Sequence, residues 1–136
     1  MTTTTFKRSD DYALIRELLI DAGMRPPAAL EVGPTPRIDY IVAREGSAAV
    51  ALFLLVDGVE VHFCFRRRVW GRSDPIARAF LAWVWASTPA TRLVGPVPIE
   101  KRLVLRLARL VGFTEFAAGS NPELVLLEIR KPCNSD

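Results

Sequence analysis

The chain has 136 residues, of which 50% are hydrophobic and 24% are charged. This length and composition exclude a disordered chain and fit a folded domain that needs no disulfide or metal to stabilise its core. The formal net charge is only +3, but the sequence pI of about 9.2 indicates an anionic partner such as nucleic acid, acidic lipid or a phosphorylated cofactor.

The two cysteines are far apart, with Cys64 in an apolar run and Cys133 in a polar tail. This is neither metal-ligand spacing nor the density of a secreted disulfide scaffold, so we expect no metal site and a reducing cytoplasm as the compartment. The N-terminus shows no basic segment leading into an apolar one, and the longest apolar run, Ala48–Val56, is about half of what spans a bilayer. We therefore expect no signal peptide, no membrane span and no membrane partner.

The first expected element in chain order is an amphipathic helix. Residues 1–8 are expected to be a frayed tail, after which Ser9 and two aspartates provide a cap and a negative first turn before leucines at helical spacing. Gly23 stands where this helix should end. Residues 25–37 hold four prolines and predict a long shaped loop rather than a regular helix or a central strand.

Three antiparallel strands are expected next, over Ile38–Arg44, Ala48–Val56 and Val59–Phe65. Asp57-Gly58 separates the second from the third, and this dipeptide between apolar runs is a strong hairpin signal because both residues tolerate the positive φ of a type I′ turn. The sequence therefore predicts a meander of three strands.

Beyond this meander the hydrophobic period changes to that of a helix. The remaining expected elements are a largely buried helix over Ile76–Trp85, a strand over Arg92–Val97, an amphipathic helix over Ile99–Val111 ending at Gly112, a last strand over Glu123–Ile129, and a frayed tail over 131–136. The strand-helix-strand unit requires a parallel pair of strands. The sequence thus predicts a single α/β domain over 1–136, with a mixed, mostly antiparallel sheet flanked by helices.

A short segment, Arg68-Val69-Trp70-Gly71-Arg72-Ser73, lies at the strand-to-helix turn of that parallel unit. A turn there aims unpaired backbone N–H groups and the positive end of a helix at one point, which favours an anion site. The segment resembles the signature of the GNAT family of N-acetyltransferases, Gln/Arg-x-x-Gly-x-Gly/Ala after the fourth strand, with Ser73 as the last small residue. Gly112-Phe113 matches the family's frequent Gly-Phe, and the resemblance extends over Ile38–Ile129. The short form, rich in arginine and tryptophan, suggests a phage-encoded or degenerate member.

The resemblance implies acetyl-CoA or coenzyme A as a substrate, with a β-α-β core that binds it. Amides of residues 69–73 would hold the pyrophosphate, backbone groups of residues 63–65 would pair with the pantetheine arm, and nearby arginines, including Arg67, would face the phosphates. The residues expected to bind the cofactor are Phe63, Cys64, Phe65, Arg66, Arg68, Val69, Trp70, Gly71, Arg72 and Ser73. The alternative for the arginines is a solvated loop. Asp74 opposes the assignment, because it places a carboxylate where a dianion should bind.

The resemblance also implies transfer of acetyl to an amine, in which a base takes a proton from the incoming ammonium. Alternation along Val59–Phe65 puts Glu60, His62 and Cys64 on one face of the strand. His62, the only histidine, is the first candidate for the base and Glu60 the second; the alternative for His62 is a strand histidine paired with a neighbour. Cys64 is expected to be a small core residue, since buried thiols stay protonated.

The family's usual acid is a tyrosine four residues before the glycine of Gly-Phe, and that position is Ala108 here. Arg102, Arg106 and Arg109 share one face of the same helix, which is either solvated or contacts the 3′-phosphate of coenzyme A or an acidic partner. Three tryptophans could stack on a base or on adenine, but Trp83 and Trp85 lie within an apolar helix and are expected to belong to the core, which leaves Trp70.

Three functions remain open on the sequence. The first is an acyl-CoA-dependent N-acyltransferase that transfers acetyl from acetyl-CoA to an unidentified amine, entering between the proline-rich loop and the open end of the sheet. The second is a GNAT-like binding or assembly module, of a phage for example, that has lost catalysis. The third, a small basic nucleic-acid-binding protein, ranks last because no helix-turn-helix or RNA-binding signature is present. A last strand exposed at a sheet edge would allow a homodimer.

Overall fold

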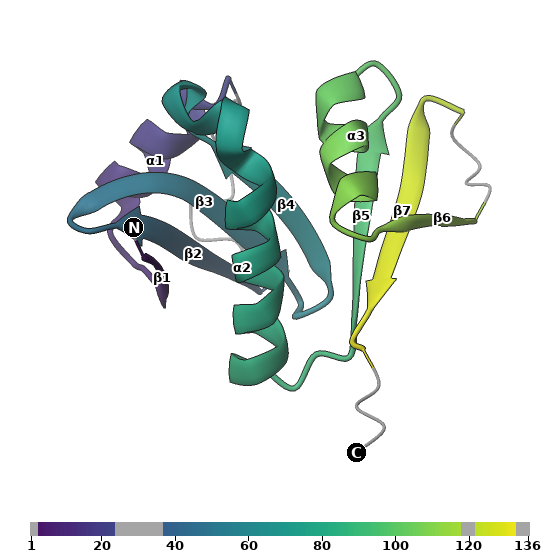
Figure 1. Ribbon diagram of the computed structural model, residues 1–136, viewed down its shortest axis with the longest axis horizontal. Helices are drawn as coiled ribbons and strands as arrows, with labels where there is room; N and C mark the ends of the chain where they lie inside the picture. The colour runs from purple at the N-terminus through teal and green to yellow at the C-terminus, as the bar shows by residue number, and fades with distance from the viewer. Residues whose placement is uncertain (1–2, 24–36, 118–121, 133–136) are drawn as a thin grey trace.

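Seven strands form one continuous sheet, with helices on both of its faces (Figure 1). The computed structural model describes residues 3–23, 37–117 and 122–132, so most of the proline-rich loop and residues 133–136 lie outside the described part. The elements are β1 (Thr4–Arg8), α1 (Tyr12–Asp21), β2 (Ile38–Glu45), β3 (Ala48–Val56), β4 (Glu60–Phe65), the 3₁₀ helix η2 (Arg67–Arg72), α2 (Ser73–Ser87), β5 (Arg92–Pro98), α3 (Arg102–Leu110), β6 (Thr114–Ala117) and β7 (Leu124–Arg130). Their order in the sheet is β1-β2-β3-β4-β5-β7-β6.

The N-terminal segment is a strand and not the frayed tail that we expected of residues 1–8. Residues 4–8 pair antiparallel with β2, with Phe6 opposite Ala43. The ring of Phe6 lies 6.0 Å from that of Phe53 and 5.9 Å from that of Phe80, between ring centroids. Threonine is β-branched and suits an extended chain, and the ladder with β2 together with the packing of Phe6 holds this polar segment on the sheet.

The expected meander of β2, β3 and β4 is confirmed, including its hairpin. Asp57 and Gly58 both have positive φ, 52° and 74°, as a type I′ turn requires. The register of β2 on β3 shifts between Ala43 and Arg44, which marks a bulge near the sheet edge.

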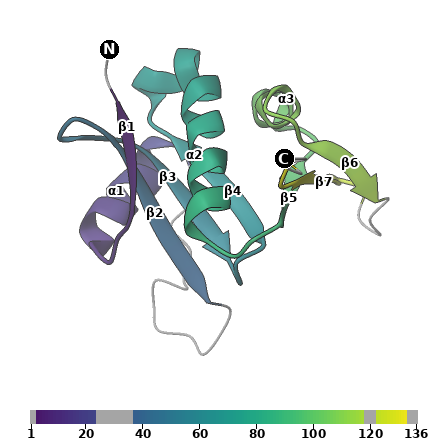
Figure 2. The same ribbon diagram turned by 60° about the horizontal axis from the view of Figure 1, so that its bottom comes forward.

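Helices α1 and α2 cover opposite faces of the meander (Figure 2). Helix α1 begins after Asp11, whose carboxylate accepts the N–H of Leu14 at 3.2 Å, and buries Leu18 on one face. Helix α2 follows η2 without a break and buries Phe80, which stacks on Phe53 at 3.9 Å between centroids. Within the described residues, no helix is long and apolar enough to cross a membrane.

The C-terminal part differs from the expectation in two ways. Helix α3 starts only at Arg102, because residues 99–101 form the turn after β5. An additional strand, β6, follows α3 and pairs antiparallel with β7. The last strand therefore lies between β5 and β6, and the expectation that it forms an exposed sheet edge is wrong: the edges are β1 and β6. The second tail begins later than expected, since Lys131 still donates its N–H to the carbonyl of Thr91 at 2.9 Å.

Candidate functional site

Strands β4 and β5 are parallel neighbours that share a single ladder position among the described residues, Glu60 opposite Val94. At this point the N–H of Val94 donates to the carbonyl of Val59 at 2.9 Å. Beyond it, β4 runs on to Phe65 and β5 to Pro98 with no further ladder between them. The sheet is therefore open between two halves: one carries β1 to β4 and α2, the other β5 to β7 and α3 (Figure 1).

The open edge of β4 exposes backbone groups to this gap. Successive residues of a strand direct their N–H and C=O groups to alternate sides. The carbonyl of Val59 faces β5, whereas the N–H of Arg66 donates to Val50 of β3 at 3.0 Å, so odd-numbered residues face the gap. The backbone groups of Phe63 and Phe65 therefore lie on the open edge, and those of Cys64 face β3. Of these groups, the carbonyl of Phe65 already accepts the indole N–H of Trp70 at 3.0 Å.

A cavity of about 980 Å³ occupies the gap, and we refer to it as the β4–β5 cleft. Its walls come from β4 and the η2–α2 junction on one side and from β5 and α3 on the other. They include His62, Phe63, Phe65, Trp70, Gly71, Ser73 and Asp74 on the first side, and Pro96, Pro98, Lys101, Arg102, Leu103, Arg106 and Leu110 on the second. Phe113 also lines the cleft, with its ring 6.0 Å from that of Phe63. The cleft thus combines an apolar interior with basic residues on α3.

The remaining residues predicted for the site do not line the cleft. These are Glu60, Cys64, Arg66, Arg68, Val69 and Arg72. Cys64 is 1% exposed in the core beneath α1, and burial raises the pKa of its thiol to about 12, which confirms it as a core residue. Val69 is fully buried.

The signature segment forms η2 rather than a turn with unpaired amides. The N–H of Val69 donates to the carbonyl of Arg66 at 3.0 Å, and that of Ser73 donates to Trp70. In a 3₁₀ helix each N–H is directed at the carbonyl three residues earlier. The amides of Val69 and Ser73 are therefore satisfied within the segment in this conformation, in contrast to the sequence expectation. A Cβ added at Gly71 would meet no atom within 4 Å, so this residue faces open space.

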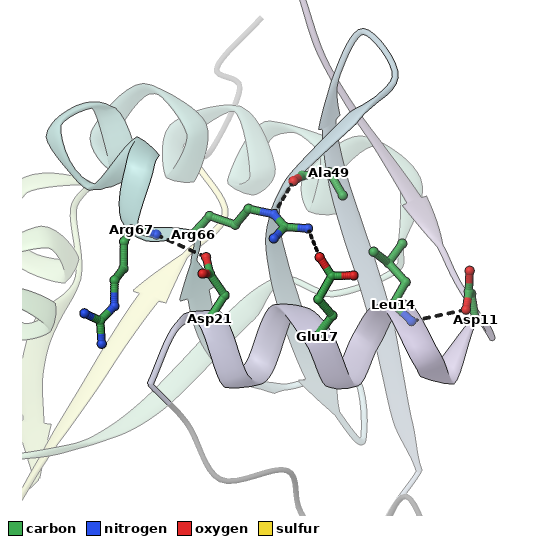
Figure 3. A network of polar contacts seen from close by, with 7 residues as sticks. All are labelled: Asp11, Leu14, Glu17, Asp21, Ala49, Arg66 and Arg67. Carbon is green, nitrogen blue, oxygen red and sulfur yellow. Dashed lines mark hydrogen bonds and ion pairs between the residues drawn. The ribbon is translucent and has the colours of Figure 1, made fainter.

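Two of the predicted phosphate-binding arginines are held by carboxylates elsewhere. The guanidinium of Arg66 donates to the carbonyl of Ala49 at 2.6 Å and to Glu17 at 3.0 Å, away from the cleft (Figure 3). Glu17 lies on α1. A second carboxylate of this helix, that of Asp21, accepts the N–H of Arg67 at 3.4 Å (Figure 3).

The second held arginine, Arg72, pairs with Glu45 at the end of β2. A hydrogen bond from this guanidinium lowers the pKa of the Glu45 carboxyl below its ordinary value. Arg66 and Arg72 therefore fix the loop to α1 and β2 in this conformation, and their charges are already compensated.

Asp74 does not stand as an uncompensated charge at the start of α2. Its carboxylate accepts a hydrogen bond from Nε of Arg78 at 2.6 Å, one helical turn later. Arg78 also donates through Nη2 to the carbonyl of Leu110 at 2.5 Å, which joins α2 to the end of α3. The objection that the sequence raised against an anion site is therefore weakened, because a guanidinium lies against the carboxylate.

Basic residues reach the cleft from α3. Arg102 and Arg106, two of the three arginines that the sequence placed on one helix face, line it, whereas Arg109 lines only an adjoining groove on the same helix that Arg102 and Arg106 also border. Glu100 and Lys101 also line the cleft, and sequence reasoning had not proposed them as site residues. Their position directly after β5 was the available signal, since the carboxyl ends of parallel strands meet at one edge of a sheet.

His62 and Glu60 lie on one face of β4, as alternation predicted. Nε2 of His62 is 2.7 Å from Oε2 of Glu60, and their side chains are 31% and 40% exposed. With Nε2 donating to the carboxylate, Nδ1 is left to accept a proton. At the position of the family's tyrosine, the methyl group of Ala108 lines the cleft, and none of the described cleft residues is a tyrosine.

Comparisons with known proteins find similarity at the level of structure only. No protein-family model and no curated sequence matches the chain. A spermidine N-acetyltransferase from Vibrio cholerae, solved with CoA and spermine, is 12% identical, with a TM-score of 0.71 over 94% of this chain and 95% of that one.

Two other solved structures are similarly close. The Campylobacter jejuni N-acetyltransferase PseH with acetyl coenzyme A is 10% identical, with a TM-score of 0.72 over 96% of this chain and 100% of that one. The aminoglycoside acetyltransferase AAC(6')-Ib with coenzyme A is 13% identical, with a TM-score of 0.70 over 94% and 95%. The fold class agrees with the sequence prediction: the chain has the fold of the GNAT acetyltransferases.

Proposed function

We propose that the protein is an acyl-CoA-dependent N-acyltransferase that transfers acetyl from acetyl-CoA to an amine. The observation that carries this proposal is the opening between β4 and β5, where one strand edge faces a cavity of about 980 Å³. An extended ligand arm can pair with such an edge in the way that an added strand does. The fold shared with acetyltransferases solved with CoA or acetyl-CoA supports the same ligand class.

In this proposal the backbone groups of Phe63 and the N–H of Phe65 pair with the pantetheine arm. The phosphates face Gly71 on one wall, where no side chain intervenes, and the guanidinium groups of Arg102 and Arg106 on the other. Guanidinium groups suit phosphate because their N–H donors form a planar fork. Arg66 and Arg72, which are held by Glu17 and Glu45, contribute to the shape of the loop more than to phosphate binding.

The reaction requires one proton acceptor close to the amine. The amine nitrogen attacks the thioester carbonyl carbon, a C–N bond forms, the C–S bond breaks and coenzyme A leaves as its thiolate. His62 takes the proton of the ammonium before the attack, Glu60 stabilises the resulting imidazolium at 2.7 Å, and the nitrogen loses its second proton to water as the amide forms. Ala108 has no proton to donate to the thiolate, so His62 or water supplies it.

A second candidate is a binding module without catalysis, and specific observations favour it. The amides of Val69 and Ser73 are satisfied within η2, the charge of Arg72 is compensated by Glu45, and Ala108 offers no acid. Such a module would retain the cleft and bind a ligand without turning it over.

Calorimetric titration of the purified protein with acetyl-CoA and with CoA, at two salt concentrations, tests the proposal. We expect Gly71→Glu to abolish binding and Gly71→Ala to retain it, because a Cβ fits at this position and only the glutamate adds a negative charge facing the phosphates. A well-folded protein that binds neither compound would refute the proposal.

An acceptor screen separates the two candidates. Release of the CoA thiol would be followed with polyamines, aminoglycosides and amino-terminal peptides, with His62→Ala as the control. Turnover that depends on His62 supports the enzyme, whereas binding without turnover on any amine favours the second candidate.

A further inference from the structure

Trp70 leaves a large aromatic surface open at the mouth of the β4–β5 cleft. The residue is 49% exposed and lines the cavity. Trp83 and Trp85, by contrast, pack against the hydrophobic core. A tryptophan that keeps half of its surface in contact with solvent beside a cavity offers a flat apolar face to a ligand.

The indole of Trp70 is held in place rather than freely rotating. Its Nε1 donates to the carbonyl of Phe65 at 3.0 Å, a backbone group of the buried end of β4. The guanidinium of Arg67 lies 5.7 Å from the ring centroid, within the range of a cation–π contact. A ligand that stacks on this ring therefore does not have to immobilise it first.

The surroundings of Trp70 are suited to a planar group that carries phosphates. Gly71 next to it leaves open space, and Arg102 and Arg106 line the opposite wall. Leu110, which is 52% exposed, adds an apolar contact at the same cleft. A flat ring, an apolar neighbour and guanidinium groups together are the chemistry that binds a nucleobase and its phosphates.

We infer that Trp70 is the stacking platform for the adenine ring of the acyl-CoA substrate. This inference rests on the proposed function and adds to it a binding residue for the nucleotide end of the ligand. The ring of Trp70 contacts the base, while its N–H stays on Phe65 and keeps the orientation.

The test compares coenzyme A with 4′-phosphopantetheine, which lacks the adenosine part. We expect Trp70→Ala to weaken CoA binding about tenfold, within the range that loss of one base–aromatic stack produces, and to leave 4′-phosphopantetheine binding unchanged. Trp70→Phe keeps an aromatic face and loses the indole N–H, so it should lie between the wild type and Trp70→Ala. Tyr12→Ala removes an aromatic residue that is 56% exposed but lies outside the cleft, and both affinities should stay as in the wild type.

Two other results of this experiment would overturn the inference. An equal loss for both ligands would mean that Trp70 acts only through the shape of β4, and no loss for CoA would mean that the base lies elsewhere. If the wild type binds CoA, either result refutes the role of Trp70 but does not affect the proposed function. If the wild type binds neither ligand, the role of Trp70 and the proposed function are both refuted. Should Trp70→Ala fail to fold, quenching of tryptophan fluorescence by adenosine 3′,5′-bisphosphate, present in the wild type and absent in Trp70→Phe, decides the question.

Discussion

Oε2 of Glu60 lies 2.7 Å from Nε2 of His62, two residues along the same face of β4. His62 lines the cleft and Glu60 does not, so the carboxylate contacts the ring from outside the cavity. Under the proposed function, His62 is the group that would meet the amine, and Glu60 would act through it as a positioning residue.

Substitution of His62 should therefore lower turnover more than substitution of Glu60. His62→Ala is expected to reduce kcat by about 10²–10⁴-fold, the usual contribution of a general base. Glu60→Gln keeps the size and a hydrogen bond but loses the charge that stabilises the imidazolium, so its reduction of kcat should be smaller, with the KM for the amine unchanged because Glu60 does not line the cleft. Steady-state kinetics on the amine found by the acceptor screen provide the measurement; a kcat in Glu60→Gln equal to that of the wild type would contradict the positioning role.

The ion pair between Arg72 and Glu45 should make stability depend on pH in the acid range. Arg72 holds the pKa of Glu45 below its ordinary value of 4.5, so the pair stabilises the fold above that pH and the contribution is lost as pH falls through the lowered pKa. We expect Arg72→Ala to lower Tm at pH 7 and to have progressively less effect as the pH falls below 4.5. In a Glu45→Gln background the same substitution should show no such pH dependence, and thermal melts from pH 2 to pH 7 measure both.

The parts of the fold that could be predicted from sequence are those determined by neighbouring residues. Asp57-Gly58 specifies its turn by backbone preference alone, and the spacing of Ile76, Phe80 and Val84 specifies the buried face of α2. β1 was missed because its side chains are mostly polar and its place depends on Phe6 packing against residues far along the chain.

The candidate site also has features that local sequence patterns predict and others that depend on distant residues. Its location after β4 followed from the order of the elements, and the shared face of Glu60 and His62 followed from strand alternation. The pairing of Arg66 with Glu17 and of Arg72 with Glu45 did not, because these partners are 49 and 27 residues apart and no local pattern joins them. An arginine-rich loop therefore does not reveal from its sequence which of its charges are already compensated.

Cys64 should be unreactive in the folded protein. Burial raises the pKa of its thiol to about 12, so at pH 8 almost none of it is thiolate, the form that reacts with alkylating reagents. In a Cys133→Ser background we expect no alkylation by iodoacetamide under native conditions and full alkylation after unfolding in urea. Mass spectrometry measures the alkylated fraction of Cys64 in the native and the unfolded protein. Rapid labelling of the native protein would show that β4 opens far more readily than its buried position implies.

The arginines of α3 offer a matched pair for testing whether the cleft binds phosphates. Arg106 lines both the β4–β5 cleft and an adjoining groove on α3, whereas Arg109, on the same helix, lines only that groove. Both substitutions to alanine remove one positive charge, so any effect of net charge alone is equal in the two. We expect Arg106→Ala to weaken CoA binding about two- to fivefold at low salt, as for a partly solvated ion pair, and the difference from the wild type to shrink as salt screens the interaction. Arg109→Ala should bind CoA as the wild type does. Equal losses in the two variants would show that the helix attracts the ligand only through its overall field, and would remove Arg106 from the site.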